Sequence, residues 1–311
     1  MSIVPVFSPA SPQAKVIVDL FYIVLGVCAV ILTIVTGLIT WSLLRFRGRA
    51  DSPEPRQTFG SVPVEVAWTL IPLLVVICLF VLTARAMNQS DPLPAQLRAD
   101  LVITGHQWWW EARYPNSGVV AANEIHIPAG ARWLVRLEAA DVIHDFWAPR
   151  LGRKMDMIPG HPNYIWLEAQ RPGTYSGACA EYCGAQHSWM RFSVIAQPPG
   201  AFEQWQQEQL RPLPTPASGP GAQGEKLFST LTCANCHSVG QAAARPSIAP
   251  DLTHLAGRQT LAGGVLENTP ANLVRWLRSP QAIKPGSLMP NLQLTQQQAA
   301  ELAAYLEPQK Q

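Results

Sequence analysis

The chain has 311 residues, enough for two or three domains. Only 14% of its residues are charged and 48% are hydrophobic, which indicates that part of the chain lies in a lipid bilayer. The formal net charge of +2 is small and evenly spread, so we expect no nucleic-acid partner.

Two long uncharged runs, residues 20–44 and 66–84, predict a pair of membrane-spanning helices within an N-terminal segment 1–92. A spanning helix needs about 20 apolar residues, and Pro72 is tolerated inside one. A buried helix of a soluble protein is the alternative for both runs, and a cleaved signal peptide for the first, although no basic segment precedes it. The connecting loop is rich in arginine: Arg45, Arg47, Arg49 and Arg56. The positive-inside rule therefore predicts a cytoplasmic loop and an extracytoplasmic remainder.

Residues 97–205 change to short alternating segments separated by turns, which predicts an all-β domain built as a small sandwich or barrel. Ile125 and Ile127 alternate with polar neighbours, and beyond a turn Trp133, Val135 and Leu137 do the same.

Residues 206–222 are rich in proline, glycine and polar side chains and predict a linker. Residues 223–311 predict a small all-α domain. In its segment 269–280, a capping threonine and a proline precede a helix with Leu273, Trp276 and Leu277 on one face. A second helix follows Thr295, which is its candidate cap.

The stretch "CAEYCGAQHSWM" offers four soft or borderline metal ligands in twelve residues: Cys179, Cys183, His187 and Met190. Sulfur ligands select copper, zinc or iron–sulfur clusters, and a mononuclear blue-copper site uses one cysteine, two histidines and a methionine. Two thiolates can instead bridge two copper ions, each completed by one histidine and one weaker ligand.

The second imidazole must come from elsewhere in the β domain, and His144, directly after a predicted strand, is the best candidate among His106, His126, His144 and His161. A disulfide or a structural Cys2His2 zinc site are the alternatives. Neither of them explains Met190.

The stretch "CANCH" is the attachment motif for a c-type haem: Cys233 and Cys236 form the thioethers, and His237 is one axial ligand. Met289 is the only methionine downstream and the first choice for the second axial ligand, with His254 as the fallback. A redox Cys-x-x-Cys pair or half of a zinc site are the alternatives.

Over nearly its full length the chain resembles subunit II of haem–copper cytochrome c oxidases of the caa type, in which a class I cytochrome c domain is fused to the C-terminus. The resemblance is carried by "SVPVEVAWTLIP", "GHQWWWEARYP", "LGRKMDMIPG", "CAEYCGAQHSWM" and "CANCH". It implies a cupredoxin-like fold for residues 97–205 and a dinuclear copper A centre in it. The implied copper ligands are His144, Cys179, the backbone carbonyl of Glu181, Cys183, His187 and Met190. We call residues 179–190 the copper loop.

The resemblance also implies roles for three further side chains. Trp108 falls at the tryptophan through which electrons reach the copper, although its spacing alone favours a core aromatic. The side chain of Glu181 falls where the family reaches a magnesium ion shared with subunit I; without the resemblance it is an ordinary surface acid. Glu65 matches a glutamate near the mouth of a proton-uptake channel, and a helix-capping charge is the alternative.

The implied function is that of a subunit of a proton-translocating cytochrome c oxidase, which passes electrons from haem c to copper A and on to the oxygen-reducing site of subunit I. The implied partners are subunit I, subunit III, an upstream electron donor and the lipid bilayer. The implied location is the bacterial inner membrane, with the copper and haem domains on the periplasmic side. The two predicted spans contain no histidine, so the oxygen site is not in this chain. An electron-delivery subunit of a copper A-containing nitric oxide reductase and a membrane-anchored copper carrier are the alternatives.

Overall fold

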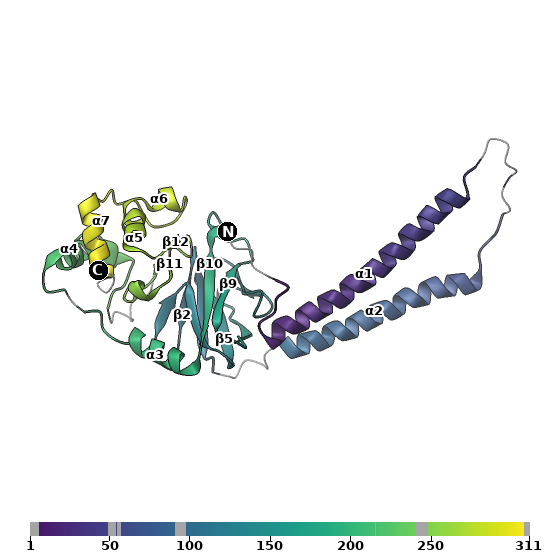
Figure 1. The fold of residues 1–311 in the computed structure, drawn as a ribbon, viewed down its shortest axis with the longest axis horizontal. Coiled ribbons are helices and arrows are strands. Elements are labelled where there is room, and N and C mark those ends of the chain that lie inside the picture. The colour runs from purple at the N-terminus through teal and green to yellow at the C-terminus, as the bar shows by residue number, and fades with distance from the viewer. Residues whose placement is uncertain are drawn as a thin grey trace. The chain divides into compact units, whose positions relative to one another are not determined.

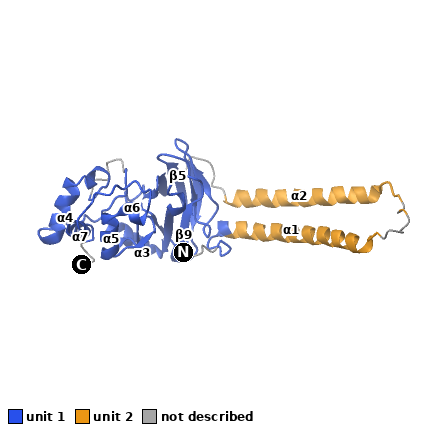
Figure 2. Ribbon diagram, turned by 90° about the horizontal axis from the view of Figure 1, so that it is seen from above, with its two compact units in different colours: residues 1–14, 92–311 blue, residues 15–91 orange. Residues whose placement is uncertain are grey.

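The computed structural model describes residues 6–48, 54, 57–90, 98–214, 216–240 and 248–307. The chain forms two compact units, one of residues 15–91 and one of residues 1–14 and 92–311 (Figure 2). The first is a pair of helices and the second combines a β domain with a helical C-terminal domain (Figure 1). The predicted multi-domain architecture is confirmed.

The helical unit consists of α1 (Pro12–Arg45), whose first residues belong to the other unit, and α2 (Val62–Ser90), which includes Pro72. Both helices are long and apolar enough to cross a membrane, and none of the most apolar 18-residue window of either is buried by other parts of the protein. Both extend beyond the predicted spans, because the flanking polar turns continue the helix. Arg49 and Arg56, half of the predicted arginine cluster, lie outside the described residues.

The β domain contains two five-stranded sheets. One has the order β3-β2-β1-β5-β8, with β3 (Val120–Ala122), β2 (Trp109–Arg113), β1 (Leu101–His106), β5 (Arg132–Ala139) and β8 (Asn163–Glu168). The other has the order β4-β10-β9-β6-β7, with β4 (Glu124–Pro128), β10 (Arg191–Gln197), β9 (Gly173–Cys179), β6 (His144–Trp147) and β7 (Met155–Met157). Each sheet has one parallel pair, β1 with β5 and β4 with β10, among antiparallel pairs.

One apolar core joins the two sheets, as expected for a cupredoxin-like sandwich. The predicted alternation is confirmed for Ile125, Ile127, Val135 and Leu137, which are fully buried. In β5 it is not strict, because Trp133 is half-buried and Leu134 is buried as well. The Trp110 ring lies edge-on to Phe192, 5.0 Å between centroids. The N-terminal residues join this domain too, since the Ser11 hydroxyl donates to the carbonyl of Leu151 at 2.7 Å.

The C-terminal domain packs α4 (Gly219–Thr230) against α7 (Gln296–Leu306), with α5 (Pro270–Arg278) beside α7. A Cβ at Gly224 would overlap the backbone carbonyl of Glu301, so glycine allows the close approach of α4 and α7. Shorter elements complete the domain: η2 (Cys233–Asn235), η3 (Leu255–Gly257), β11 (Thr260–Leu261), β12 (Leu266–Glu267) and α6 (Pro280–Ile283). The two-residue strands are a small departure from an all-α domain.

Both predicted helix caps are confirmed. The Thr269 hydroxyl accepts from the backbone N–H of Asn272 at 3.2 Å, and Thr295 forms a reciprocal capping box with Gln298. On α5, Leu273 and Leu277 are buried, and Trp276 is partly buried against the same core.

The predicted linker, residues 206–222, is shorter in the structure. Helix α3 (Pro199–Gln209) continues to Gln209 because Phe202 and Trp205 anchor it on the β domain, and α4 already begins at Gly219. Proline fits the first turn of a helix, where its missing N–H has no intrahelical partner, so the Gly-Pro pair at 219–220 starts a helix and does not prolong the linker. Residues 210–218 remain between the helices, and Thr215 among them lies outside the described residues.

Candidate metal centres

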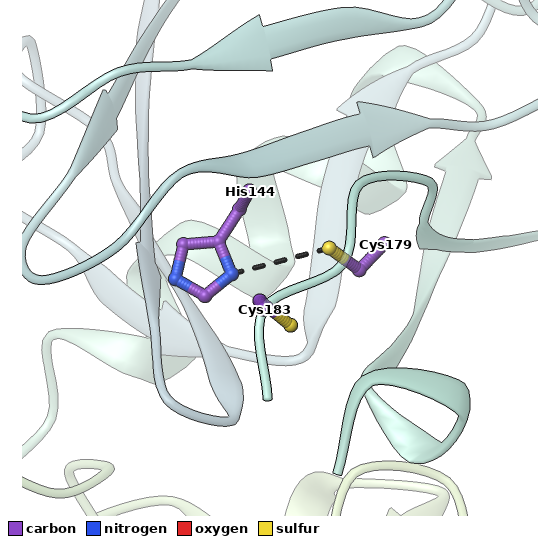
Figure 3. Close-up of side chains that lie close together, drawn as sticks. All are labelled: His144, Cys179 and Cys183. Carbon is purple, nitrogen blue, oxygen red and sulfur yellow. Dashed lines mark hydrogen bonds between the residues drawn. The ribbon is translucent and has the colours of Figure 1, made fainter. Parts of the chain in front are cut away.

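The strand ladder brings the two halves of the predicted copper site together. β6 pairs antiparallel with β9 through Phe146 and Cys179, which places His144 at the start of β6 near the sulfur of Cys179. Cys183, His187 and Met190 follow in the loop that leads through η1 (His187–Trp189) into β10. The ligand atoms of His144, Cys179 and Cys183 all lie within 4.8 Å of one another (Figure 3).

Each cysteine has one imidazole and one weaker donor beside it. Cys179 Sγ lies 3.9 Å from His144 Nδ1 and 3.1 Å from the carbonyl oxygen of Glu181. Cys183 Sγ lies 3.7 Å from His187 Nδ1 and 3.7 Å from Met190 Sδ. This donor set, two thiols with two equivalent sets of imidazole and weak ligand, fits a pair of soft metal ions such as copper.

The two thiols differ sharply in acidity. A hydrogen bond from Cys183 lowers the pKa of the Cys179 thiol to about 3, and the His144 ring and the Glu181 backbone add to this effect. The same hydrogen bond, together with burial, raises the pKa of Cys183. A bound metal ion would coordinate the sulfurs as thiolates, so metal binding would release protons from this pair. Both cysteines are free of disulfides.

His144 is fixed by an aspartate that sequence reasoning did not single out. Its Nε2 lies 2.8 Å from Asp141 Oδ1, and the backbone N–H of Gln107 donates to the other oxygen of Asp141. With Nε2–H donating to Asp141, Nδ1 presents its lone pair to the site. Burial lowers the pKa of His144, but the Cys179 and Asp141 hydrogen bonds outweigh it and the pKa is raised. The available signal was an aspartate three residues before a candidate histidine ligand.

Packing excludes water from the sulfur side of the site. His144, Cys179, Cys183 and Met190 are all buried. Gly105 is required behind the imidazole, because a Cβ there would lie 2.8 Å from His144 Cδ2. The side chains of Glu181 and Tyr182 are exposed. The backbone carbonyl of Glu181 therefore lies at the site, whereas its carboxylate lies in solvent.

Asp145, next to His144, is buried opposite Asp156 in the β6–β7 ladder. A charged carboxylate at this position would place a negative charge beside the predicted copper ligand His144. Burial and the hydrogen bond with Asp156 raise the pKa of Asp145 to about 7, so this charge is only partly present at neutral pH.

Trp108 contacts the copper loop directly. Its Nε1–H donates to the carbonyl of Cys183 at 2.9 Å, and the Gln107 side chain donates to the same oxygen at 2.8 Å. The fully buried aromatic of this segment is Trp110, whereas Trp108 is half-buried. The core-aromatic alternative therefore describes Trp110 better than Trp108.

The second candidate site lies in the C-terminal domain at η2, directly after α4. Cys233 is half-buried and Cys236 exposed. His237 Nδ1 lies 2.7 Å from the carbonyl of Pro250, so Nδ1–H donates there and Nε2 is left as a metal ligand. The side chains of Ile248 and Leu288 are 69% and 71% exposed, which fits a domain whose apolar surface a porphyrin would cover.

Met289 packs partly buried against the core of this domain, and the Gln281 side chain donates to its carbonyl at 3.0 Å. The fallback ligand, His254, is half-buried, and its Nε2 has no hydrogen-bond partner within the described residues. Met289 therefore stays the first choice for the second axial ligand on the sequence pattern, with His254 as the fallback.

Glu65 lies in the first turn of α2, and its carboxylate accepts from the backbone N–H of Ser61 at 3.2 Å. This is the helix-capping contact that sequence reasoning held open beside the role in proton uptake.

Comparisons with known proteins agree along the chain. The transmembrane domain of cytochrome c oxidase subunit II matches residues 5–84, its periplasmic domain matches residues 119–197, and the cytochrome c family matches residues 221–310. These families imply binding of copper A and haem c.

Whole-chain relatives carry the same description. Cytochrome c oxidase subunit 2 of Alkalihalophilus pseudofirmus is 34% identical over 305 residues, which cover 96% of this chain and 88% of the relative. The subunit 2 of Bacillus sp. strain PS3 is 32% identical over 283 residues, covering 84% and 78%. The crystal structure of the periplasmic domain of subunit II from Bradyrhizobium japonicum is 31% identical and covers 37% of this chain and 96% of that one, with a TM-score of 0.35.

With two apolar helices, a cupredoxin-like domain and a cytochrome c domain in this order, the chain belongs to the cytochrome c oxidase subunit 2 family, in the form with a fused C-terminal cytochrome c.

Proposed function

We propose that this chain accepts electrons for a cytochrome c oxidase, in its C-terminal domain first and in its β domain second, and delivers them to the oxygen-reducing subunit I. The observation that carries this proposal is the pairing of each buried cysteine with one imidazole and one weak donor, in the same chain as a haem-attachment motif. When bound, the copper pair and the haem supply one-electron redox chemistry at the two sites.

The residues of the chain have distinct tasks in this proposal. Cys179, Cys183, His144, His187, Met190 and the backbone carbonyl of Glu181 would together hold the two copper ions. Asp141 holds the His144 ring in the form that presents Nδ1. A rigid and water-free ligand set changes little when one electron arrives, which favours fast transfer. In the C-terminal domain, Cys233, Cys236, His237 and Met289 would hold the haem.

Trp108 remains the candidate for electron transfer from a donor into the copper loop, supported by its hydrogen bond to the Cys183 carbonyl. The exposed carboxylate of Glu181 remains the candidate for a magnesium ion shared with subunit I. Glu65 remains the candidate for the proton-uptake entrance, with its capping bond to Ser61 as a structural role it fills in any case.

The proposed setting is the bacterial inner membrane. Arg45 in the last turn of α1 and Arg47 beyond it support a cytoplasmic loop between the helices, and hence periplasmic β and C-terminal domains. Subunit I and subunit III are the proposed partners in the bilayer, and an upstream cytochrome or its reductase is the proposed donor.

Electron paramagnetic resonance of the oxidised protein, with copper and iron counts, tests the copper assignment. We expect hyperfine structure from one electron shared by two copper nuclei, and one iron per chain. His187→Gln and Met190→Leu should change that spectrum, while Met155→Leu, a methionine of the same domain outside the copper loop, should leave it unchanged. A single-copper spectrum would refute the dinuclear site, and zinc in place of copper would restore the structural-zinc alternative.

The choice between oxygen and nitric oxide as the final acceptor is tested on the purified complex. We expect oxygen consumption with reduced donor, and nitric oxide turnover in its place would establish the alternative reductase.

A further inference from the structure

The strongest feature outside the two predicted metal sites is a buried carboxylate between the β domain and the C-terminal domain. Glu124 begins β4 and is 5% exposed. Its Oε1 accepts from the backbone N–H groups of Gln259 and Thr260, each at 2.9 Å, and from the Thr260 hydroxyl at 3.1 Å. Its Oε2 lies 3.0 Å from the N–H of Gln259. Every one of these donors belongs to the C-terminal domain.

The Glu124 carboxylate is surrounded by hydrogen-bond donors and a positive charge, as a buried anion requires. A buried carboxylate is costly unless hydrogen bonds and opposite charge compensate it. Two N–H groups and a hydroxyl donate to the Glu124 carboxylate. The guanidinium of Arg258, the residue directly before Gln259, interacts favourably with the negative charge of this carboxylate. Such charge-assisted hydrogen bonds are about twice as strong as neutral ones and fix orientation.

A second contact joins the two predicted metal sites. Gln186 is 3% exposed, and its side-chain amide donates to the carbonyl of Pro285. Gln186 precedes the predicted copper ligand His187, and Pro285 opens the turn that leads to Met289. Gly286 has a φ of +84°, and a Cβ there would lie 3.6 Å from Ala185 Cβ. The backbone of this turn therefore lies directly on the copper loop.

Further contacts surround these two. A Cβ at Gly264 would lie 3.9 Å from Arg191 Cβ on β10, and one at Gly263 would lie 3.8 Å from the Trp189 carbonyl. Figure 1 shows β11 and β12 beside β10, in agreement with these distances.

We propose that Glu124 anchors the C-terminal domain on the β domain, and that the electron from the haem crosses where Gln186 meets Pro285 and not through Trp108, the entry residue that the family resemblance implies. This inference rests on the function proposed above. The step moves one electron from the haem iron, which is oxidised, to the copper pair, which is reduced, and no bond or proton changes place. The anchor holds the Met289 turn against the copper loop, and tunnelling between centres falls steeply with the gap that separates them.

Hydrogen–deuterium exchange on the purified oxidase complex tests the anchor without reference to turnover. In Glu124→Gln and Glu124→Ala, the amides of Gln259 and Thr260 lose a charged acceptor, and we expect their exchange to quicken about tenfold or more. The turn 284–289 should exchange faster as well, because it is held against the copper loop by the same docking. Glu138→Gln is the matched control, since Glu138 is an acid of the same domain that pairs with Arg136 on its own strand.

Flash reduction of the haem, followed by its reoxidation, tests the crossing point. We expect the rate in the wild type to be independent of solvent viscosity, because the domains are already docked. In the Glu124 variants the rate should fall about tenfold and become viscosity-dependent. Gln186→Ala should slow the transfer more than Trp108→Phe does, with haem and copper spectra and both reduction potentials unchanged.

The outcomes separate this inference from the function it rests on. A wild type in which reduced haem never passes its electron to copper would refute the proposed function. A wild type that transfers normally, with Glu124 variants unchanged in exchange and rate, would overturn the anchor. Faster exchange without a slower rate, or a larger loss in Trp108→Phe than in Gln186→Ala, would overturn the crossing point.

Discussion

The two predicted metal sites are organised in different ways. In the β domain the strand ladder and the copper loop place each thiol within 4 Å of one imidazole, and Cys183 within 4 Å of the Met190 thioether, with Asp141 orienting one ring. In the C-terminal domain, His237 is oriented by the Pro250 carbonyl, but Ile248 and Leu288 remain largely exposed.

A sheet can preform a small metal site because each ligand stands on a backbone that is already hydrogen-bonded. A small helical domain cannot enclose a porphyrin-sized volume without the porphyrin, since the apolar walls would have nothing to pack on. We therefore expect the predicted copper site to form with the fold of the β domain, and the C-terminal domain to need its haem to complete its core.

The largest expected effect follows from this contrast. Replacing both Cys233 and Cys236 by alanine removes the covalent haem. The free energy of unfolding of the C-terminal domain should then fall by at least about 4 kcal/mol, which is the stabilisation that a ligand gives at a concentration a thousandfold above its dissociation constant. Removing copper should leave the β domain folded. Amide hydrogen exchange, followed separately for the two domains as the temperature rises, checks this prediction. Equal losses of stability in the two domains would contradict the contrast.

One buried side chain in each domain should also add a pH dependence to the free energy of unfolding. Burial lowers the pKa of His126 in the β domain to about 4, against 6.5 in an unfolded chain. Between these values the unfolded chain binds more protons, so acidification from pH 6.5 to 4 destabilises the β domain by up to about 1.4 kcal/mol per unit. Urea unfolding of His126→Gln should lose this dependence.

In the C-terminal domain, Lys284 adds a dependence in the alkaline range. Burial lowers the pKa of Lys284 to about 8 from 10.5, so the unfolded chain again holds the extra proton between these values. The domain should therefore gain stability as the pH rises from 8 to 10.5. Lys284→Gln should flatten that curve, and a wild-type domain that weakens over the same range would contradict the shift.

A smaller effect is expected from the side chain that orients His144. Asp141→Asn keeps the size of the side chain but removes the negative charge that accepts the hydrogen bond from His144 Nε2–H. Loss of such a partner of a metal-binding histidine lowers metal affinity about 10- to 100-fold. Copper titration of the apo-protein measures it, with Glu138→Gln as control. An unchanged affinity would mean that packing against Gly105 alone fixes the ring.

Sequence patterns predicted the elements with strong local signals and missed the long-range polar contacts. The alternation at Ile125 and Ile127 and the caps at Thr269 and Thr295 depend on neighbours a few residues away, so they could be inferred from spacing. Glu124 reaches donors that are 135 and 136 residues distant, and nothing in its local sequence marks it.

The ends of the predicted linker show a related limit. Proline and glycine at 219–220 suit a flexible segment and a helix N-terminus equally well, and only the packing of α4 on α7 decides between them. Asp141 could have been found from its spacing to His144, but its hydrogen bond depends on the turn between β5 and β6.

The smallest expected effect concerns that linker. Deleting residues from the stretch between Leu210 and Ser218 should slow haem-to-copper transfer a few-fold, because the remaining chain must span the same docked distance under tension. Lengthening the linker with glycine and serine should change the transfer rate little, because in our proposal the Glu124 anchor and not the linker sets the docked geometry. Without the anchor, a longer linker would lower the effective concentration of the C-terminal domain at the β domain and slow the transfer. Flash kinetics on a shortened, a lengthened and a Glu124→Gln lengthened protein separates these cases. A rate that falls with added length in the wild-type background would mean that the tether alone brings the two centres together.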